Sequence, residues 1–103
     1  MNLPAWFTIR VYGLYVEHEK VLVSDEIIKG RQITKFPGGG LQYGEGLKEC
    51  LVREIMEEMG AQAIELEHFY TTDHFQQSAF HTEPMQVISA YYSFKLKDPE
   101  KLQ

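Results

Sequence analysis

The stretch that decides the fold runs from Gly39 to Ala61 and reads GGLQYGEGLKECLVREIMEEMGA. In its second half an apolar residue recurs at every fourth position: Leu47, Leu51, Ile55 and Met59. This spacing predicts an amphipathic α-helix over about 47–59 that packs its apolar stripe against a sheet. Gly60 is the expected C-terminal stop and Gly46 the expected N-cap, although Ser or Thr would cap the helix better.

The same helix crowds three carboxylates into one turn: Glu54, Glu57 and Glu58. At about 100° per residue they fall within an arc of roughly 100° and about 6 Å of helix axis, so they repel one another and can also converge on one ion. Oxygen ligands without a neighbouring His or Cys favour Mg²⁺ or Mn²⁺ over zinc. Taken alone, the acids are also explained by a solvated face of the helix.

A glycine-rich segment, FPGGGLQYGEG, precedes the helix at residues 36–46. Glycines allow positive backbone φ angles and let the backbone approach a ligand closely. By itself this segment is equally well explained as a hairpin loop. It is not the nucleotide-triphosphate P-loop, because no Gly-Lys-Ser/Thr follows.

The rest of the chain is rich in β-branched and aromatic residues. Strands are predicted at 7–17, 21–23, 33–36, 63–72 and 87–96, of which the first, apolar on both faces, should be central. The segment 24–35 is polar with a turn at Gly30, and Pro37 ends the strand at 33–36. Residues 73–85 are predicted to form a polar loop, and 97–103 a turn with no element following. One helix between such strands predicts a mixed sheet with the helix on one face, an α/β or α+β arrangement.

The composition predicts one soluble domain over residues 1–103. A net charge of −5 argues against broad capture of nucleic acid, so the sequence carries no DNA-binding signal. No apolar run is long enough to cross a membrane, and the N-terminus lacks the pattern of a secretory signal. Because Cys50 is the single cysteine, an internal disulfide is excluded and a cytoplasmic location is expected. Cys50 is interpreted as a buried thiol.

Joined together, the glycines, the acids and one arginine resemble the signature of the Nudix hydrolase (MutT-like) family, Gly-x5-Glu-x7-Arg-Glu-U-x-Glu-Glu-x-Gly-U, where U is a bulky aliphatic residue. The matching positions are Gly39, Glu45, Arg53, Glu54, Ile55, Glu57, Glu58 and Gly60. Only Ala61 departs, being small where the family prefers Ile, Leu or Val, which should affect packing rather than chemistry. The order of elements around this box is also similar.

The resemblance implies a Nudix-type α/β/α sandwich with a mixed β-sheet. In that fold a final strand and a second helix follow at about the point where this sequence stops, and both would be missing here. The sequence is then a fragment truncated at its C-terminus, a trimmed member, or a chain whose partner covers the exposed face. A homodimer is one way to cover it.

By the same resemblance, the chain would be a pyrophosphohydrolase that cleaves a nucleoside diphosphate linked to another group, with water attacking phosphorus. Its metal ligands would be Glu54, Glu57 and Glu58, with Glu54 also a candidate general base. The carbonyl of Gly38 would complete the shell of a Mg²⁺ ion, with Mn²⁺ as the alternative, beside Gly39. Arg53 would orient the carboxylates through its fork of donors, and Glu45 would hold the loop against the helix through Arg53.

Two further groups of residues follow from the resemblance. A base or metal ligand downstream of the box has three candidates, Glu83, Asp98 and Glu100, of which Glu83 is best placed, in the loop before the last strand. Aromatic residues near the expected pocket could stack a nucleobase, although packing in the core is the commoner role: Tyr12, Phe36, Tyr70, Phe75 and Phe80.

A non-catalytic alternative also fits the signature. A Nudix-like domain could bind a nucleotide as a sensor or regulatory module, with weak catalysis or none. Such domains usually lose acids of the box, whereas Glu54, Glu57 and Glu58 are all present here, which favours the enzyme.

Overall fold

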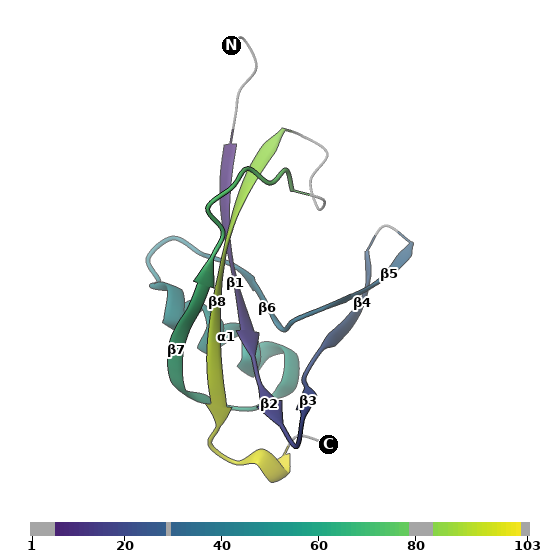
Figure 1. Ribbon diagram of the computed structural model, residues 1–103, viewed down its shortest axis with the longest axis vertical. Coiled ribbons are helices and arrows are strands. Elements are labelled where there is room, and N and C mark those ends of the chain that lie inside the picture. The colour runs from purple at the N-terminus through teal and green to yellow at the C-terminus, as the bar shows by residue number, and fades with distance from the viewer. Residues whose placement is uncertain (1–5, 29, 79–83, 102–103) are drawn as a thin grey trace.

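The structure is a computed structural model and describes residues 6–28, 30–78 and 84–101 (Figure 1). Its elements are β1 (Trp6–Leu14), β2 (Val16–Glu17), β3 (Lys20–Val21), β4 (Ser24–Ile28), β5 (Arg31–Lys35), β6 (Gly38–Gly40), α1 (Leu47–Met59), β7 (Ala63–Thr71), β8 (Met85–Leu96) and the 3₁₀ helix η1 (Pro99–Lys101). Within these ranges no helix is long and apolar enough to cross a membrane.

Four strands form the main sheet, in the order β6-β1-β8-β7. Strand β1 pairs in parallel with β8 over its whole length and antiparallel with β6, and β7 pairs antiparallel with β8. Both central strands have buried residues on both faces, Val11 and Tyr12 in β1 and Ser89 and Ala90 in β8, as expected of inner strands. The prediction of a mixed sheet with a central first strand is therefore confirmed.

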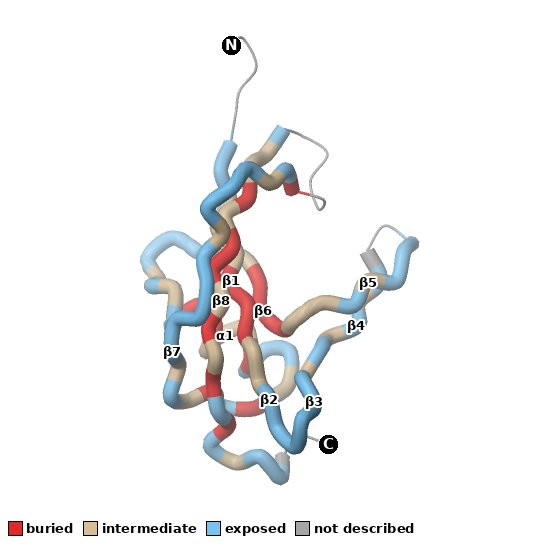
Figure 2. The backbone as a smooth tube through the Cα atoms, viewed as in Figure 1, coloured by how far each residue is buried: buried red, intermediate tan, exposed pale blue. Residues whose placement is uncertain are grey.

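Helix α1 covers one face of this sheet, and the core lies between them (Figure 2). Its residues Leu51 and Ile55 are fully buried against sheet residues such as Val11. Complete burial of such a side chain contributes about 1.5–3 kcal/mol. The helix approaches β1 closely at Gly13, where an added Cβ would stand 3.3 Å from Leu51 and collide with the ring of Phe94. A glycine is needed there because helix and sheet leave no room for a side chain.

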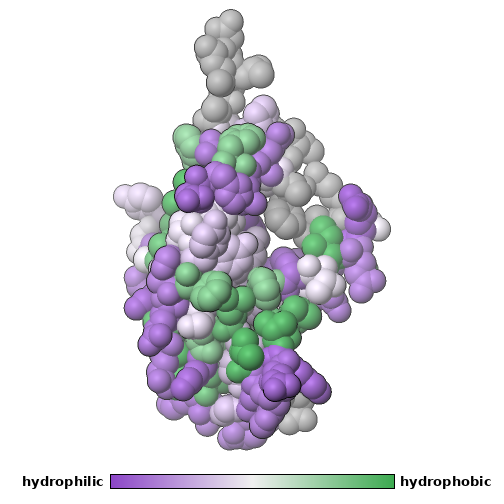
Figure 3. Space-filling model, viewed as in Figure 1, coloured by the Kyte–Doolittle hydropathy of each residue, from purple (hydrophilic) through white to green (hydrophobic). Residues whose placement is uncertain are grey.

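The other face of the sheet carries aromatic residues and no α-helix among the described residues. Tyr12 of β1 and Tyr91 of β8 are neighbours in register and stack with ring centroids 5.5 Å apart. Exposed apolar side chains continue along this face, including Phe69 and Tyr70 of β7. Figure 3 shows hydrophobic residues gathered on the molecule's surface around the strands. The prediction of a homodimer stays a prediction.

The expected helix over 47–59 is confirmed at both ends, whereas four other local expectations are wrong. The first strand breaks at Tyr15, so its end is the separate strand β2. The segment 24–35 is not a polar connection leading back into the main sheet. It forms a hairpin of β4 and β5 that stands apart as its own two-stranded sheet, with Asp25 opposite Thr34. Cross-strand polar pairs stabilise this hairpin without a buried face.

The glycine-rich segment also differs from the loop that was expected. Gly38–Gly40 form the edge strand β6, which pairs with Arg10, Val11 and Tyr12 of β1. A strand of three glycines has no side chains to keep α1 away, so the helix can lie directly against its backbone. At the other end of the chain, residues 99–101 form η1 where only a turn was predicted.

Candidate active site

The last two turns of α1 present the acidic residues of the site, and the helix ends are capped as the sequence predicts. Glu49 accepts a hydrogen bond from the backbone N–H of Gly46 at 2.9 Å, which satisfies one of the free donors at the helix start. Gly60 ends the helix in the left-handed conformation, with φ of 64°. These caps fix where the carboxylates emerge.

A bidentate ion pair joins the helix to the segment before it. Arg53 Nε donates to Glu45 Oε2 at 3.0 Å, and Arg53 Nη2 donates to Glu45 Oε1 at 2.8 Å. The backbone N–H of Gln42 also donates to Glu45 at 2.8 Å. The Arg53 guanidinium, with the help of the Gln42 N–H, lowers the pKa of Glu45 to about 2. The predicted contact between Glu45 and Arg53 is thus present.

The remaining donors of Arg53 reach two of the three helix acids. Its Nη1 donates to Glu54 at 3.1 Å and to both oxygens of Glu57 at 3.2 Å, while Nη2 donates to the carbonyl of Gly40 at 3.1 Å. The hydrogen bonds to Glu45 above all, and those to Glu57 and Glu54, raise the pKa of Arg53. A single guanidinium therefore sets the orientation of three carboxylates, as its fixed fork of donors allows.

Strand β6 borders Glu54 directly. An added Cβ on Gly39 would collide with the Glu54 carboxylate, so that carboxylate occupies the space a side chain would fill. An added Cβ on Gly38 would collide with the carbonyl oxygen of Val11, and the φ of Gly38 is +146°, a conformation that favours glycine. Only 16% of the Glu54 side chain is exposed, so its charge is held close to the backbone of β6.

Glu58 contacts the protein differently from its two neighbours. Partial burial raises its pKa, while Lys35 and a hydrogen bond from the backbone of Gly38 act in the opposite direction. The ammonium of Lys35 lies 3.4 Å from the carbonyl oxygen of Gly38 and 3.2 Å from Glu26. Lys35 of β5 thus partly offsets the effect of burial on the charge of Glu58.

Cys50 lies between α1 and β6 and is fully buried. Its sulfur is 3.5 Å from the carbonyl oxygen of Gly40. Burial, followed by the nearby Glu45, raises the pKa of the Cys50 thiol to about 12. A thiol that stays protonated at neutral pH fits a packing role and not that of a nucleophile.

The chemistry of these donors fits a hard divalent cation. Three carboxylates on adjacent turns of α1 lie next to β6, a strand of glycines that has no side chains to cover its carbonyl oxygens. Mg²⁺ prefers such oxygen ligands. As they stand, no three acidic, His or Cys side chains in the described ranges are close enough together to form a metal site. Glu54 and Glu57 are instead held by their ion pairs with Arg53. Their role as metal ligands stays a prediction.

Of the three downstream candidates, Asp98 and Glu100 lie after the last strand, Glu100 within η1. Glu83 lies outside the described residues. Asp98 and Glu100 lie beyond the end of β8, near the hydrogen bond that the Lys97 N–H donates to the carbonyl of Gln62. In Figure 1 η1 lies at one end of the molecule, below the main sheet. A role for any of them as base or ligand stays a prediction.

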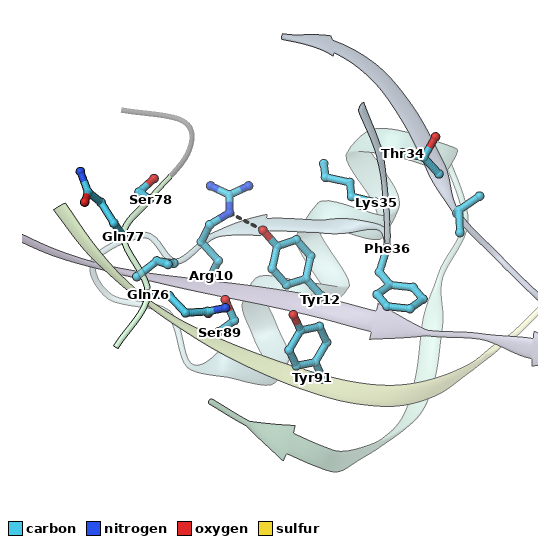
Figure 4. Close-up of a pocket in the computed structure, with 12 residues that line it drawn as sticks. Arg10, Tyr12, Thr34, Lys35, Phe36, Gln76, Gln77, Ser78, Ser89 and Tyr91 are labelled. Atoms are coloured by element: carbon cyan, nitrogen blue, oxygen red, sulfur yellow. Dashed lines mark hydrogen bonds between the residues drawn. The ribbon is translucent and has the colours of Figure 1, made fainter. Parts of the chain in front are cut away.

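A cavity of about 420 Å³ opens on the sheet face opposite α1 (Figure 4). Its lining residues are Arg10, Tyr12, Val23, Thr34, Lys35, Phe36, Gln76, Gln77, Ser78, Val87, Ser89 and Tyr91. Tyr12 and Phe36 were among the aromatic residues considered for base stacking. Sequence reasoning missed Arg10, Lys35 and Tyr91. The alternation along β1 and β8 could have placed Arg10 and Tyr91 on one face of the sheet, whereas no local pattern places Lys35 of β5 beside them.

The chain resembles known proteins in sequence and in fold. A model of the NUDIX domain matches residues 6–103. Among solved structures, a NUDIX hydrolase from Nitrosomonas europaea is 20% identical with a TM-score of 0.68, over 91% of this chain and 63% of that one. The E. coli ORF135 protein is 18% identical with a TM-score of 0.65, over 89% and 66%.

A third solved structure, the MutT protein from Methanosarcina mazei Go1, is 23% identical with a TM-score of 0.63, over 93% of this chain and 73% of that one. At such identities the likeness shows the fold, and it confirms the predicted Nudix-type mixed sheet. This chain spans 63% and 66% of the length of the first two structures. The family model covers nearly the whole chain and includes the box at Gly39–Ala61, so this protein belongs to the Nudix domain family.

Proposed function

We propose that this protein is a hydrolase that cleaves the pyrophosphate linkage of a nucleoside diphosphate derivative by attack of water on phosphorus, with Mg²⁺ or Mn²⁺ as its metal ion. Membership of the Nudix family supports a hydrolase. The observation that carries the proposal is the network in which Arg53 orients Glu45, Glu54 and Glu57 beside the glycine backbone of β6. A purely structural role explains neither the clustered acids nor the glycines.

In this proposal Glu54, Glu57 and Glu58 hold the metal ion together with the carbonyl of Gly38. A bound metal ion would neutralise phosphate charge and lower the pKa of a water molecule. Glu54 is the candidate general base, because its carboxylate is shielded and fixed by Arg53. Arg53 is a positioning residue, since its donors are already engaged by carboxylates and by Gly40.

The carboxylates also have to be able to move. Glu57 has 57% of its side chain exposed, so it can leave Arg53 for a metal ion at little cost in packing. The two bonds from Arg53 to Glu45 do not involve Glu57, so the guanidinium would stay in place when Glu57 moves. In this proposal the arginine serves as the fixed point while Glu57 adjusts.

A nucleotide-binding sensor is the competing proposal. One observation supports it: no three acids are gathered for a metal ion in the described part of the chain. Both proposals take the ligand to be a nucleotide, and both keep the expectation of a cytoplasmic protein.

The experiment that separates them measures turnover and binding together. The protein is incubated with Mg²⁺ and a panel of ADP-ribose, dinucleoside polyphosphates, NADH and nucleoside triphosphates, and the released phosphates are identified. Hydrolysis that is lost in Glu57→Gln and Glu58→Gln supports the enzyme. The control is Glu67→Gln, which removes an exposed carboxylate on β7, away from the box. Binding of metal and nucleotide with no turnover of any compound would support the sensor instead.

A further inference from the structure

The cavity opposite α1 combines flat aromatic surfaces with hydrogen-bonding groups. Tyr12, Phe36 and Tyr91 supply the aromatic surfaces, and Figure 4 shows the side chains of Gln76 and Ser89 lying toward the same space. Its volume of about 420 Å³ falls within the usual range of small-molecule sites. Stacking surfaces with amide and hydroxyl groups around them suit a planar heterocycle.

The charge of the cavity differs from that of the whole protein. The chain carries a net charge of −5, yet the described residues that line the cavity include two cations, Arg10 and Lys35, and no Asp or Glu. Both cations flank the ring of Tyr12, with Arg10 Cζ 5.6 Å and Lys35 Nζ 5.7 Å from its centroid. Such local charge favours a ligand that is anionic as well as aromatic.

Of the two cations, Lys35 is the one that faces the acidic helix. Its Nζ lies 3.4 Å from the carbonyl oxygen of Gly38, the first residue of β6, which borders α1. Only 12% of its side chain is exposed, whereas Glu26, its partner at 3.2 Å, is 37% exposed. Lys35 therefore holds a shielded positive charge between the aromatic wall and the carboxylates, and it can exchange Glu26 for another anion.

Arg10 is placed for a different task. Its Nε donates to the hydroxyl of Tyr12 at 2.7 Å, which fixes the orientation of that ring (Figure 4). Arg10 stands opposite Ser89 in the register of β1 and β8. A ligand that stacks on the aromatic wall would therefore meet Arg10 at the end away from Phe36, and Lys35 on the side that leads to β6.

We propose that Lys35 contacts the phosphate of a nucleotide whose base lies in this cavity, and that it makes the site prefer nucleotides over nucleosides. This rests on the proposed function in taking the ligand to be a nucleotide. The ammonium offers three rotatable donors to a phosphate, and its position beside Gly38 would place that phosphate next to β6. Lys35 thus determines specificity and is distinct from the residues of the box.

The test measures binding of AMP and adenosine by calorimetry, in metal-free buffer containing EDTA. Wild-type protein is compared with Lys35→Gln and Lys35→Met, which both remove the charge, and with Lys35→Arg, which keeps it. The control variant, Lys95→Gln, removes one exposed cation from β8 outside the cavity. Thermal unfolding of each variant shows that it is folded before binding is measured.

We expect removal of the charge to weaken AMP binding about tenfold or more, the size of one lost charge-assisted hydrogen bond. Adenosine binding should stay unchanged, Lys35→Arg should recover most of the AMP affinity, and Lys95→Gln should resemble wild type. A purely structural role for Lys35 would weaken both ligands equally, and that result overturns the proposal. The proposal is also overturned if the wild-type protein binds AMP no more tightly than adenosine. No hydrolysis is measured, so failure here is distinct from failure of the proposed reaction.

Discussion

The carboxylate of Glu54 occupies the position where a side chain on Gly39 would begin. This relationship joins a residue of α1 to a residue of β6 and explains why the box begins with a glycine. Arg53 Nη1 donates to Oε2 of the same carboxylate at 3.1 Å. Glu54 is therefore fixed between a cation and a bare backbone, and both contacts can be tested separately.

Gly39→Ala should displace Glu54 while leaving the protein folded. The new methyl group meets the far end of a flexible side chain, so the free energy of unfolding should fall by only about 1–2 kcal/mol. Hydrolysis should be reduced much more strongly than that. The matched control is Gly40→Ala, whose Cβ meets only Arg10 at 3.7 Å. Equal activity of the two variants would contradict a role for the placement of Glu54.

Gly38→Ala should act on stability instead. The φ of +146° is strained for alanine, and the Cβ would collide with the backbone of β1, which cannot move aside without breaking the pairing of Gly38 with Tyr12. We expect the free energy of unfolding to fall by about 3 kcal/mol or more, measured by urea denaturation. A variant as stable as Gly40→Ala would show that β6 is paired differently.

Arg53→Lys should lower hydrolysis although the charge is kept. A lysine ammonium cannot reach Glu45 with two parallel bonds and still hold Glu54 and Glu57. Loss of a residue that orients metal ligands typically costs about 10- to 100-fold in activity or metal affinity. The assay is the hydrolysis rate with Mg²⁺ titrated. Arg31→Lys, on the exposed strand β5, is the control and should behave as wild type.

The pH dependence of stability should reveal Glu45. Its pKa is lowered from 4.5 to about 2 by Arg53, so its contribution is present above pH 4.5 and is lost as the pH falls toward 2. In Glu45→Gln this part of the acid dependence should disappear. The difference in Tm between wild type and variant should be largest above pH 5 and should shrink toward pH 2. A difference that stays constant with pH would mean that Glu45 is not paired.

Leu51→Ala tests the core between α1 and the sheet. Leu51 is fully buried and touches the region where Gly13 leaves no room for a side chain. Truncation of such a leucine typically costs about 2–5 kcal/mol, because it leaves a cavity. Leu47→Ala, at a partly buried position of the same helix, should cost less. The measurement is the midpoint of chemical denaturation for the two variants.

The sequence predicted the parts of the structure that depend on neighbours along the chain. The bounds of α1 follow from a four-residue apolar repeat between Gly46 and Gly60. The contact of Glu45 with Arg53 was expected from the resemblance of this segment to the Nudix signature. Helix geometry alone does not predict it, because Glu45 lies before the first residue of α1.

One missed part is local, and the other depends on contacts between distant segments. The hairpin of β4 and β5 lies within residues 24–35, but its polar residues were interpreted as a connection, and cross-strand pairs such as Lys35 with Glu26 stabilise it. The cavity combines residues of β1, β5, β8 and the segment after β7. Lys35 looks like an ordinary surface lysine in the sequence, and only the fold places it beside Gly38.

The parallel pairing of β1 with β8 has a consequence for how the protein folds. Trp6 is paired with Met85 and Leu14 with Ser93, so the centre of the sheet joins segments that are far apart along the chain. Closing so long a loop before any of these hydrogen bonds can form makes folding slow. On the ribosome, β1 has to wait until β8 has been synthesised before this pairing can form.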